Sequence, residues 1–298
     1  MRPVSVSVPA KVNLQLSVGP ERADGFHDLA TVFHAVDLLD TVTAREASEL
    51  RVTVEGEDAE SVPADATNLV WRAAQAMADA TGVDPAVHLH ISKAIPVAGG
   101  MAGGSADAAA ALLACDALWG TRVAPEELHY LAAELGSDVP FALMGGTAIG
   151  RGRGESLTPV LTRGTLHWAF AVFEGGLSTP VVYARCDDMR GPDVPSPQIS
   201  DALLSALATG DAPAVGRALR NDLQPAAISL RPELADVLEV GEDYGALGQI
   251  VSGSGPTCAF LARDEDHALD IAVALTGTGL CRTVKRARGP VPGARVLR

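Results

Sequence analysis

A glycine-rich loop between a predicted strand and a predicted helix constrains this chain more than any other feature. Four glycines occur within six residues, at Gly99, Gly100, Gly103 and Gly104. Apolar and polar residues alternate over 87–91, as in a half-buried strand, and an alanine-rich run follows Ser105. Glycine lets another molecule approach the main chain, and a helix start directs unpaired N–H groups and a positive dipole end at one point. The order strand, glycine loop, helix therefore predicts a phosphate-binding site.

Two common phosphate-binding fingerprints are absent from this loop. A P-loop carries lysine and then serine or threonine after its last glycine, whereas Gly104 is followed directly by Ser105. The dinucleotide-binding pattern G-x-G-x-x-G does not occur in the loop either. The alternatives that remain are a different kind of phosphate-binding loop and a structural turn before a buried helix.

Composition indicates a globular protein and disfavours several partners. Of 298 residues, 47% are hydrophobic and 20% charged, so we expect a large core and one or two domains. The net charge of −14 disfavours nucleic-acid or membrane binding, although a local nest of N–H groups can still hold ATP. We expect neither a signal peptide nor a membrane span. The four cysteines form no C-x-x-C pair, which disfavours a disulfide framework or zinc site and suits a reducing cytoplasm.

Strand and helix patterns alternate along the chain and predict an α+β fold of two domains, residues 1–160 and 161–298. Strands are expected at residues 4–8, 12–16, 31–36, 40–44, 50–54, 87–91, 166–173, 248–251, 257–261 and 281–286. Helices are expected at 68–81, after Ser105, from Pro125, and at 198–208, 212–219 and 265–275. Residues 145–154 are expected to form a loop near the domain border. The basic segment 282–298, with six basic residues and no acid, is expected to be solvated.

Three further segments contain residues suited to catalysis. In the sequence PAKVNL at 9–14, Lys11 and Asn13 leave one face of a strand and could hold a phosphoryl or diphosphate group, although a strand lysine is often simply solvated. The sequence GSGPT at 253–257 is by itself a tight turn between strands. Asp138, in LGSDVPF, could cap a short following helix or act as a general base. The residues alone leave both roles of Asp138 open.

Taken in order, these segments resemble the signatures of the GHMP kinases. The glycine loop is similar to the family's P-x-x-x-G-[LM]-[GA]-[GS]-[GS]-S, the N-terminal segment to P-A-K-[VI]-N-L, the third to G-S-G-P-T, and the segment around Asp138 to G-[SA]-D-[VI]-P-[FL]. The resemblance implies a two-domain α+β kinase with its active site in the interdomain cleft. It also implies ATP as phosphoryl donor, Mg²⁺, Asp138 as base and Lys11 as its catalytic partner.

The same resemblance implies which residues bind ATP and the metal. The ATP-binding residues would be Asn68, Lys93, Pro96, Val97, Ala98, Gly99, Gly100, Met101, Ala102, Gly103, Gly104 and Ser105. Ser105 would also contact Mg²⁺. The loop departs from many relatives at Ala98, Met101 and Ala102, where glycine, leucine and glycine are common. We expect this departure to alter the flexibility of the loop and not its chemistry.

Four shorter strings, at residues 22–29, 65–69, 179–183 and 221–225, resemble one branch of the family. Members of that branch phosphorylate the 2-hydroxyl of 4-diphosphocytidyl-2-C-methyl-D-erythritol in the non-mevalonate isoprenoid route. The resemblance implies that the substrate is bound by Asn13, Phe26, His27, Thr179 and Tyr183.

Phe26 and Tyr183 could stack on the pyrimidine and His27 could hydrogen-bond its edge. Alternatively, Phe26 is an ordinary core aromatic and His27 a structural histidine. The rival functions are another GHMP kinase, of the homoserine or mevalonate type, and a non-catalytic ligand sensor. We expect no nucleic-acid or membrane partner and a monomer or homodimer.

Overall fold

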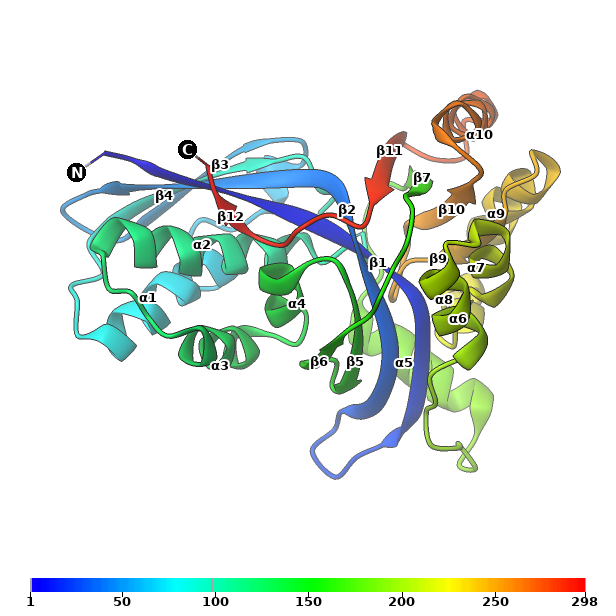
Figure 1. The fold of residues 1–298 in the computed structure, drawn as a ribbon, viewed down its shortest axis with the longest axis horizontal. Helices are drawn as coiled ribbons and strands as arrows, with labels where there is room; N and C mark the ends of the chain where they lie inside the picture. The colour runs from blue at the N-terminus through cyan, green and yellow to red at the C-terminus, as the bar shows by residue number, and fades with distance from the viewer. Residues whose placement is uncertain (1, 98, 298) are drawn as a thin grey trace.

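A long, curved β-hairpin links the two halves of the molecule in the computed structural model, which describes residues 2–97 and 99–297 (Figure 1). The hairpin consists of the antiparallel strands β1 (Val4–Glu21) and β2 (His27–Glu46). Its open end belongs to the N-terminal half, and its tip reaches past the C-terminal half beside α5 (Thr179–Arg190). The register of the pair shifts between Asn13 and Gln15, so the side chains on either side of this bulge face differently.

The N-terminal half is built on an eight-stranded sheet with the order β12-β1-β2-β4-β3. Strand β5 also pairs with β2, β6 pairs with β5, and β8 pairs with β1. Besides the hairpin, the strands are β3 (Arg51–Gly56), β4 (Val87–Lys93), β5 (Thr147–Gly152), β6 (Ser156–Pro159), β8 (Arg220–Asn221) and β12 (Arg295–Val296).

The helices between β3 and β5 in the chain lie on one side of this sheet, as Figure 1 shows. They are α1 (Leu69–Thr81), α2 (Gly103–Trp119), α3 (Pro125–Leu135) and α4 (Val139–Met144), and a short 3₁₀ helix spans Ala59–Ser61. Helix α2 packs between the hairpin and the other three helices. Six of its alanines, including Ala108, Ala110 and Ala114, are fully buried because small side chains let neighbouring elements approach closely.

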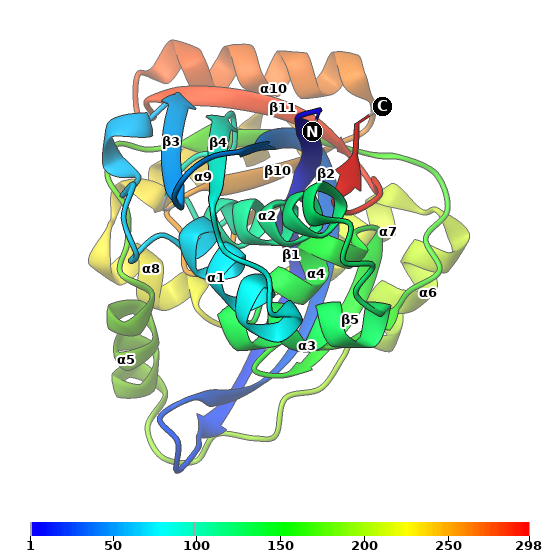
Figure 2. The ribbon, with the colours of Figure 1, turned by 90° about the vertical axis from the view of Figure 1, so that its left-hand side faces the viewer.

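The C-terminal half contains a four-stranded antiparallel sheet with the order β11-β7-β10-β9. Its strands are β7 (Leu166–Val172), β9 (Gly248–Val251), β10 (Cys258–Ala262) and β11 (Thr283–Gly289). Its helices are α5, α6 (Asp201–Thr209), α7 (Ala212–Ala218), α8 (Gln224–Leu230), α9 (Glu233–Asp243) and α10 (Glu265–Thr278). Helix α10 runs alongside β11 in Figure 2, and the fully buried Trp168, Phe170 and Phe260 fill the layers around the sheet. None of the helices in the described chain has the length and hydrophobicity of a membrane span.

Most of the predicted elements are confirmed, but residues 145–154 are not a loop. The expected strands 4–8 and 12–16 are parts of β1, and 31–36 and 40–44 are parts of β2. Residues 147–152 form β5, which pairs with β2. Gly150 serves packing in this strand, because a Cβ atom there would lie 2.7 Å from Cε2 of Phe33.

The basic segment near the C-terminus is not a solvated tail. Its residues form β11 in the C-terminal sheet and β12, which returns to pair with β1. Three of its basic side chains pair with acids of the N-terminal half: Arg282 with Asp58, Lys285 Nζ with Glu57 Oε1 at 2.6 Å, and Arg288 Nε with Asp37 Oδ2 at 3.2 Å. Since sequence composition alone cannot show these partners, the segment resembled a free tail.

Candidate active site

A cavity of about 750 Å³ lies where the hairpin, the glycine loop and the C-terminal half meet. Many of the predicted site residues line it, and they come from five separate segments. These residues are Lys11, Asn13, Phe26, His27, Gly99, Gly100, Ala102, Gly103, Gly104, Ser105, Asp138, Thr179 and Tyr183. Five other predicted residues, Asn68, Lys93, Pro96, Val97 and Met101, are not among its described lining, and the predicted residue Ala98 lies outside the described residues.

Lys11 lies at the centre of the cavity wall and is held by three oxygen atoms. Its Nζ donates to Asn13 Oδ1 at 2.7 Å and to the carbonyl of Gly100 at 3.0 Å, and it lies 3.8 Å from Asp138 Oδ2. The Asn13 amide in turn donates to Thr31 Oγ1 at 2.9 Å, which fixes its orientation. Burial lowers the pKa of Lys11, and the charge of Asp138 opposes that shift. The arrangement holds a cation against the open space of the cavity.

Asp138 precedes α4 but does not cap it with its side chain. Its carbonyl accepts from the N–H of Ala142 at 3.1 Å, whereas its carboxylate makes no capping hydrogen bond. The side chain is 32% exposed and faces Lys11. Of the two roles that the sequence left open, the side-chain cap is therefore absent, and the carboxylate is free to act in the cavity.

The glycine loop packs directly against the second glycine loop, between β9 and β10. Gly100 has φ +76°, and a Cβ atom there would lie 2.1 Å from the carbonyl oxygen of Ser252. The Ser252 hydroxyl donates to the Gly100 carbonyl at 3.0 Å. A Cβ atom on Gly253 would lie 3.3 Å from Lys11 Nζ. Thus the two glycine-rich motifs, 153 residues apart at Gly100 and Gly253, enclose the Lys11 ammonium together.

The first turn of α2 faces the cavity, and its first three N–H groups have no hydrogen-bond partner among residues 2–97 and 99–297. The first helical hydrogen bond is donated by Ala106 to the carbonyl of Ala102, and the first turn contains no acidic residue. Ala102 caps this turn with φ +61°, a left-handed conformation that costs an alanine free energy. A Cβ atom on Gly103 would meet Lys93 and Ile95, whereas Gly104 is exposed toward the cavity. The free N–H groups and the helix dipole suit an anion.

Lys93 lies beneath this turn in a buried cluster and not in the cavity. Its Nζ contacts Asp40 Oδ2, and it donates to Asp107 Oδ2 at 2.8 Å. Asp40 also accepts from the N–H groups of Ala94 and Ile95, at 2.6 and 2.9 Å. Burial raises the pKa of Asp107 to about 8, which Lys93 opposes and the charge of Asp40 reinforces. This cluster joins β2, the start of the glycine loop and α2.

Two other predicted ATP-binding residues also have structural contacts. Asn68 caps α1: its side chain accepts from the N–H of Val70 at 2.8 Å and donates to the carbonyl of Pro63 at 2.6 Å. Met101 is fully buried, and its carbonyl accepts from the N–H of Lys11 at 3.3 Å. Asn68 therefore supports α1 and Met101 supports the glycine loop, and neither residue lines the cavity.

The far end of the cavity carries the aromatic residues. Phe26 is 49% exposed on the hairpin tip, and the Arg153 guanidinium lies 5.1 Å from its ring centroid. Tyr183, on α5, lies 5.0 Å from the His27 ring, centroid to centroid. His27 Nε2 lies 3.0 and 3.1 Å from the two carboxylate oxygens of Asp187, also on α5. Arg153 and Asp187 line the cavity and were not predicted from the sequence.

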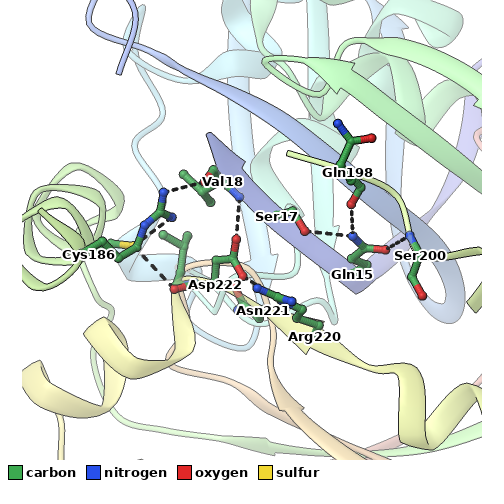
Figure 3. A network of polar contacts seen from close by, with 11 residues as sticks. Gln15, Ser17, Val18, Cys186, Gln198, Ser200, Arg220, Asn221 and Asp222 are labelled. Atoms are coloured by element: carbon green, nitrogen blue, oxygen red, sulfur yellow. Dashed lines mark hydrogen bonds and ion pairs between the residues drawn. The ribbon is translucent and has the colours of Figure 1, made fainter. Parts of the chain in front are cut away.

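Residues 221–225 hold the second glycine loop and the hairpin together. The Asn221 amide donates to the carbonyls of Val251 and Gly253, at 2.8 and 2.7 Å. Asp222 Oδ2 accepts from the N–H of Val18 at 3.0 Å, as Figure 3 shows. This segment therefore fixes the distance between the hairpin and the glycine loop that contacts Lys11.

A second polar contact anchors the same stretch of the hairpin, and its residues line the same hollow as Val18 and Asp222. Beyond the bulge, the Gln15 amide donates to the carbonyl of Gln198 at 2.6 Å and accepts from the N–H of Ser200 at 2.9 Å (Figure 3). The contact ties β1 to the segment before α6. Because Lys11 and Asn13 lie on the same strand, their position follows that of this anchored hairpin.

Comparisons with known proteins agree along the whole chain. Residues 68–146 match the family model of the GHMP kinases N terminal domain, and residues 203–279 match that of the GHMP kinases C terminal. Proteins named 4-diphosphocytidyl-2-C-methyl-D-erythritol kinase are 61% identical in Streptomyces avermitilis, over 99% of both chains, and 57% identical in Thermobifida fusca, over 99% of this chain and 98% of that one. A crystal structure of 4-(cytidine 5'-diphospho)-2C-methyl-D-erythritol kinase shares 34% identity and a TM-score of 0.78, covering 95% of this chain and 98% of that one.

Proposed function

This chain belongs to the GHMP kinases, and we propose that it transfers the γ-phosphoryl group of ATP to the 2-hydroxyl of 4-diphosphocytidyl-2-C-methyl-D-erythritol. The observation that carries the proposal is the Lys11–Asp138 pair, 3.8 Å apart, in a cavity with a helix start on one side and aromatic residues on the other. The relatives reported above are named for this activity, and each matches this chain over nearly its whole length.

In the proposed reaction, Asp138 accepts the proton of the attacking hydroxyl. Its carboxylate is partly exposed in the cavity and makes no capping bond, so it can reach a substrate. Lys11 orients the same hydroxyl and stabilises negative charge on the transferring group. Its ammonium is already held by Asn13 and Gly100, which lowers the cost of positioning it during the reaction.

The proposed ATP site is the first turn of α2 with the preceding glycine loop. The unpaired N–H groups of Gly103, Gly104 and Ser105 would bind phosphate oxygens. Lys93, Asn68 and Met101 would act indirectly, by supporting the loop. In-line transfer then follows from placing the γ-phosphate between this turn and the Lys11–Asp138 pair, since positioning and charge stabilisation dominate phosphoryl transfer.

Mg²⁺ fits this site as a partner of the nucleotide. The described residues contain no cluster of three His, Cys, Asp or Glu side chains placed to hold a metal, but Ser105 and Asp138 both line the cavity with oxygen atoms. Mg²⁺ is commonly held by one or two protein oxygens together with phosphates and water. Ser105 would contact the ion, which would neutralise charge on the phosphates.

At the other end, Phe26, Tyr183 and His27 would bind the cytosine, with Thr179 and Asn13 toward the diphosphate and the sugar alcohol. The Thr179 and Ser254 hydroxyls lie 2.9 Å apart, so α5 and the second glycine loop meet on this side of the cavity. ATP and the cytidylated substrate would therefore occupy different ends of one cavity.

We also propose the setting in which the kinase works. Residues 1–160 would form the nucleotide-binding domain and residues 161–298 its partner, with the last strand returning to β1. Four free cysteines suit the reducing cytoplasm, where ATP is available. A monomer or homodimer is expected, which light scattering after gel filtration will distinguish.

The test is an ADP-release assay with the cytidylated substrate, homoserine and mevalonate as acceptors. We expect ADP release with the cytidylated substrate alone, and a new phosphorus coupling to the 2-position in the product by NMR. Equal or better turnover of homoserine or mevalonate would assign the chain to another GHMP kinase activity. ATP binding without ADP release from any acceptor would favour a ligand sensor.

A further inference from the structure

Helix α5 presents two side chains to His27, one turn apart. Tyr183 and Asp187 occupy positions i and i+4 and therefore share a face of the helix. Tyr183 packs at 5.0 Å from the His27 ring centroid, and both Asp187 oxygens lie within 3.1 Å of Nε2. The His27 side chain is 6% exposed, so the ring has little freedom to turn away from this contact.

The Asp187 contact decides which ring nitrogen carries the proton. An ionised carboxylate can only accept hydrogen bonds, so the nitrogen that faces it must be the donor. In neutral His27 the proton is therefore on Nε2, and Nδ1 carries a lone pair. No residue of 2–97 or 99–297 makes a hydrogen bond with Nδ1, and His27 lines the cavity. The ring thus offers a bare acceptor to a ligand.

A bare acceptor distinguishes the two common pyrimidines. Cytosine has an amino group at C4, which can donate to Nδ1, whereas uracil has a carbonyl oxygen there, which also carries lone pairs. A free histidine could move its proton to Nδ1 and bind uracil equally well. With Asp187 on Nε2 that change would leave two acceptors facing each other at 3.0 Å.

We propose that Asp187 is a positioning residue that fixes the His27 proton on Nε2 and so makes the site select an amino-bearing pyrimidine over an oxo-pyrimidine. The inference rests on the proposed function for the identity of the ligand, but its statement about the His27 proton does not. Asp187 itself need not touch the substrate.

The test compares Asp187→Asn with Asp187→Glu and a matched control. An asparagine amide can present either its oxygen or its nitrogen to His27, so it no longer dictates the proton position, whereas glutamate remains an acceptor. Asp188→Asn makes the same change at the next residue, which is exposed. For each variant, kcat/KM is measured with the cytidylated substrate and with its uridylated analogue.

We expect the cytidine-to-uridine ratio of kcat/KM to fall about tenfold or more in Asp187→Asn, to recover in Asp187→Glu, and to stay at the wild-type value in Asp188→Asn. A merely structural role would lower both rates together and leave the ratio unchanged. An unchanged ratio in a folded Asp187→Asn variant would overturn the proposal.

Nitrogen-15 NMR of the histidines, assigned with His27→Gln, provides a readout that needs no activity. In the substrate-free wild type we expect the Nε2–H tautomer of His27, and a mixture of tautomers in Asp187→Asn. An Nδ1–H tautomer in the wild type would overturn the inference even if the kinase assay succeeds. Absence of kinase activity with the expected tautomers would instead contradict the proposed function and leave the Asp187 contact intact.

Discussion

Two adjacent glycines lie at the start of α2, and replacing each of them by alanine should change the free energy of unfolding in opposite directions. At Gly103 a Cβ atom would lie 3.1 Å from Lys93 Nζ and 3.2 Å from Ile95 Cγ2, in a buried layer. Overpacking of this kind costs about 1–3 kcal/mol, of which better helix propensity offsets about 1 kcal/mol. Gly103→Ala should therefore lower the free energy of unfolding by up to about 2 kcal/mol.

At Gly104 the nearest atom to an added Cβ is Leu69 Cδ1, at 3.8 Å, which is an ordinary contact. Gly104→Ala should therefore raise the free energy of unfolding by about 0.5–1 kcal/mol, because alanine is the better helix former and restricts the unfolded chain. The new methyl group lies on the exposed, cavity-facing side of the turn, where we place the phosphates. The dissociation constant for ATP should rise at least about tenfold, equivalent to about 1.4 kcal/mol.

Urea denaturation followed by circular dichroism measures the first effect and titration calorimetry with ATP measures the second. The reasoning predicts that Gly103→Ala loses stability with ATP affinity within about threefold of wild type, equivalent to less than about 0.7 kcal/mol. Gly104→Ala should lose ATP affinity while its free energy of unfolding rises. If Gly104→Ala binds ATP normally, the phosphates do not lie against the first turn of α2.

Three other changes test the surroundings of the site. Asp107→Asn tests a dependence of stability on pH. Folding raises the pKa of Asp107 from 3.8 to about 8, so the folded state holds its proton more tightly than the unfolded state does. The resulting contribution to the free energy of unfolding is full below pH 3.8 and is lost as the pH rises toward 8. Wild-type unfolding free energy should therefore fall between pH 6 and 8, by up to about 1.4 kcal/mol per pH unit more than that of Asp107→Asn, and equal slopes in urea denaturation would refute this. Ala102→Gly should raise stability by up to about 1 kcal/mol, measured by thermal denaturation, because glycine accepts φ +61° without strain; a lower midpoint would contradict it. Phe26→Ala and Tyr183→Ala should each weaken binding of the cytidylated substrate by about 1–3 kcal/mol, mainly in KM and with ATP affinity retained. Normal substrate binding by both variants would show that the cytosine does not bind at this end of the cavity.

Many residues that line the candidate cavity could be predicted from local sequence because each group of them lies in one short segment. Lys11 and Asn13 alternate on a strand, and the structure brings both to the cavity wall. The strand–loop–helix order predicted a helix after Ser105, and α2 begins slightly earlier, at Gly103. Such signals depend on side-chain periodicity and on glycine, which local sequence records directly.

The residues that act through distant partners could not be predicted in this way. Lys93 precedes the loop and carries a positive charge, so it resembled a phosphate ligand, but two buried carboxylates from other elements hold it. Asp187 becomes relevant only because α5 packs on the hairpin, 160 positions from His27. Helix α5 itself was not predicted, and its few buried residues, Val182 and Cys186, explain the weak helical pattern.

The basic C-terminal segment illustrates the same limit in the fold. Its strand β11 has the pattern of an exposed strand, with burial that is mostly partial, and β12 is only two residues long. Its order depends on pairing with β7 and β1 and on acids from the other half of the chain. Neither composition nor periodicity within the segment contains that information.

The most direct test of the account is the turnover of Asp138→Asn with the cytidylated substrate at saturating ATP. Asparagine preserves the shape of the side chain and cannot accept the proton, and Lys11 keeps its contacts with Asn13 and Gly100. We predict that kcat falls by about 10²–10⁴ while the dissociation constants of ATP and substrate stay close to those of the wild type. Turnover near the wild-type value in a folded variant would contradict the claim that the Lys11–Asp138 pair carries out the transfer.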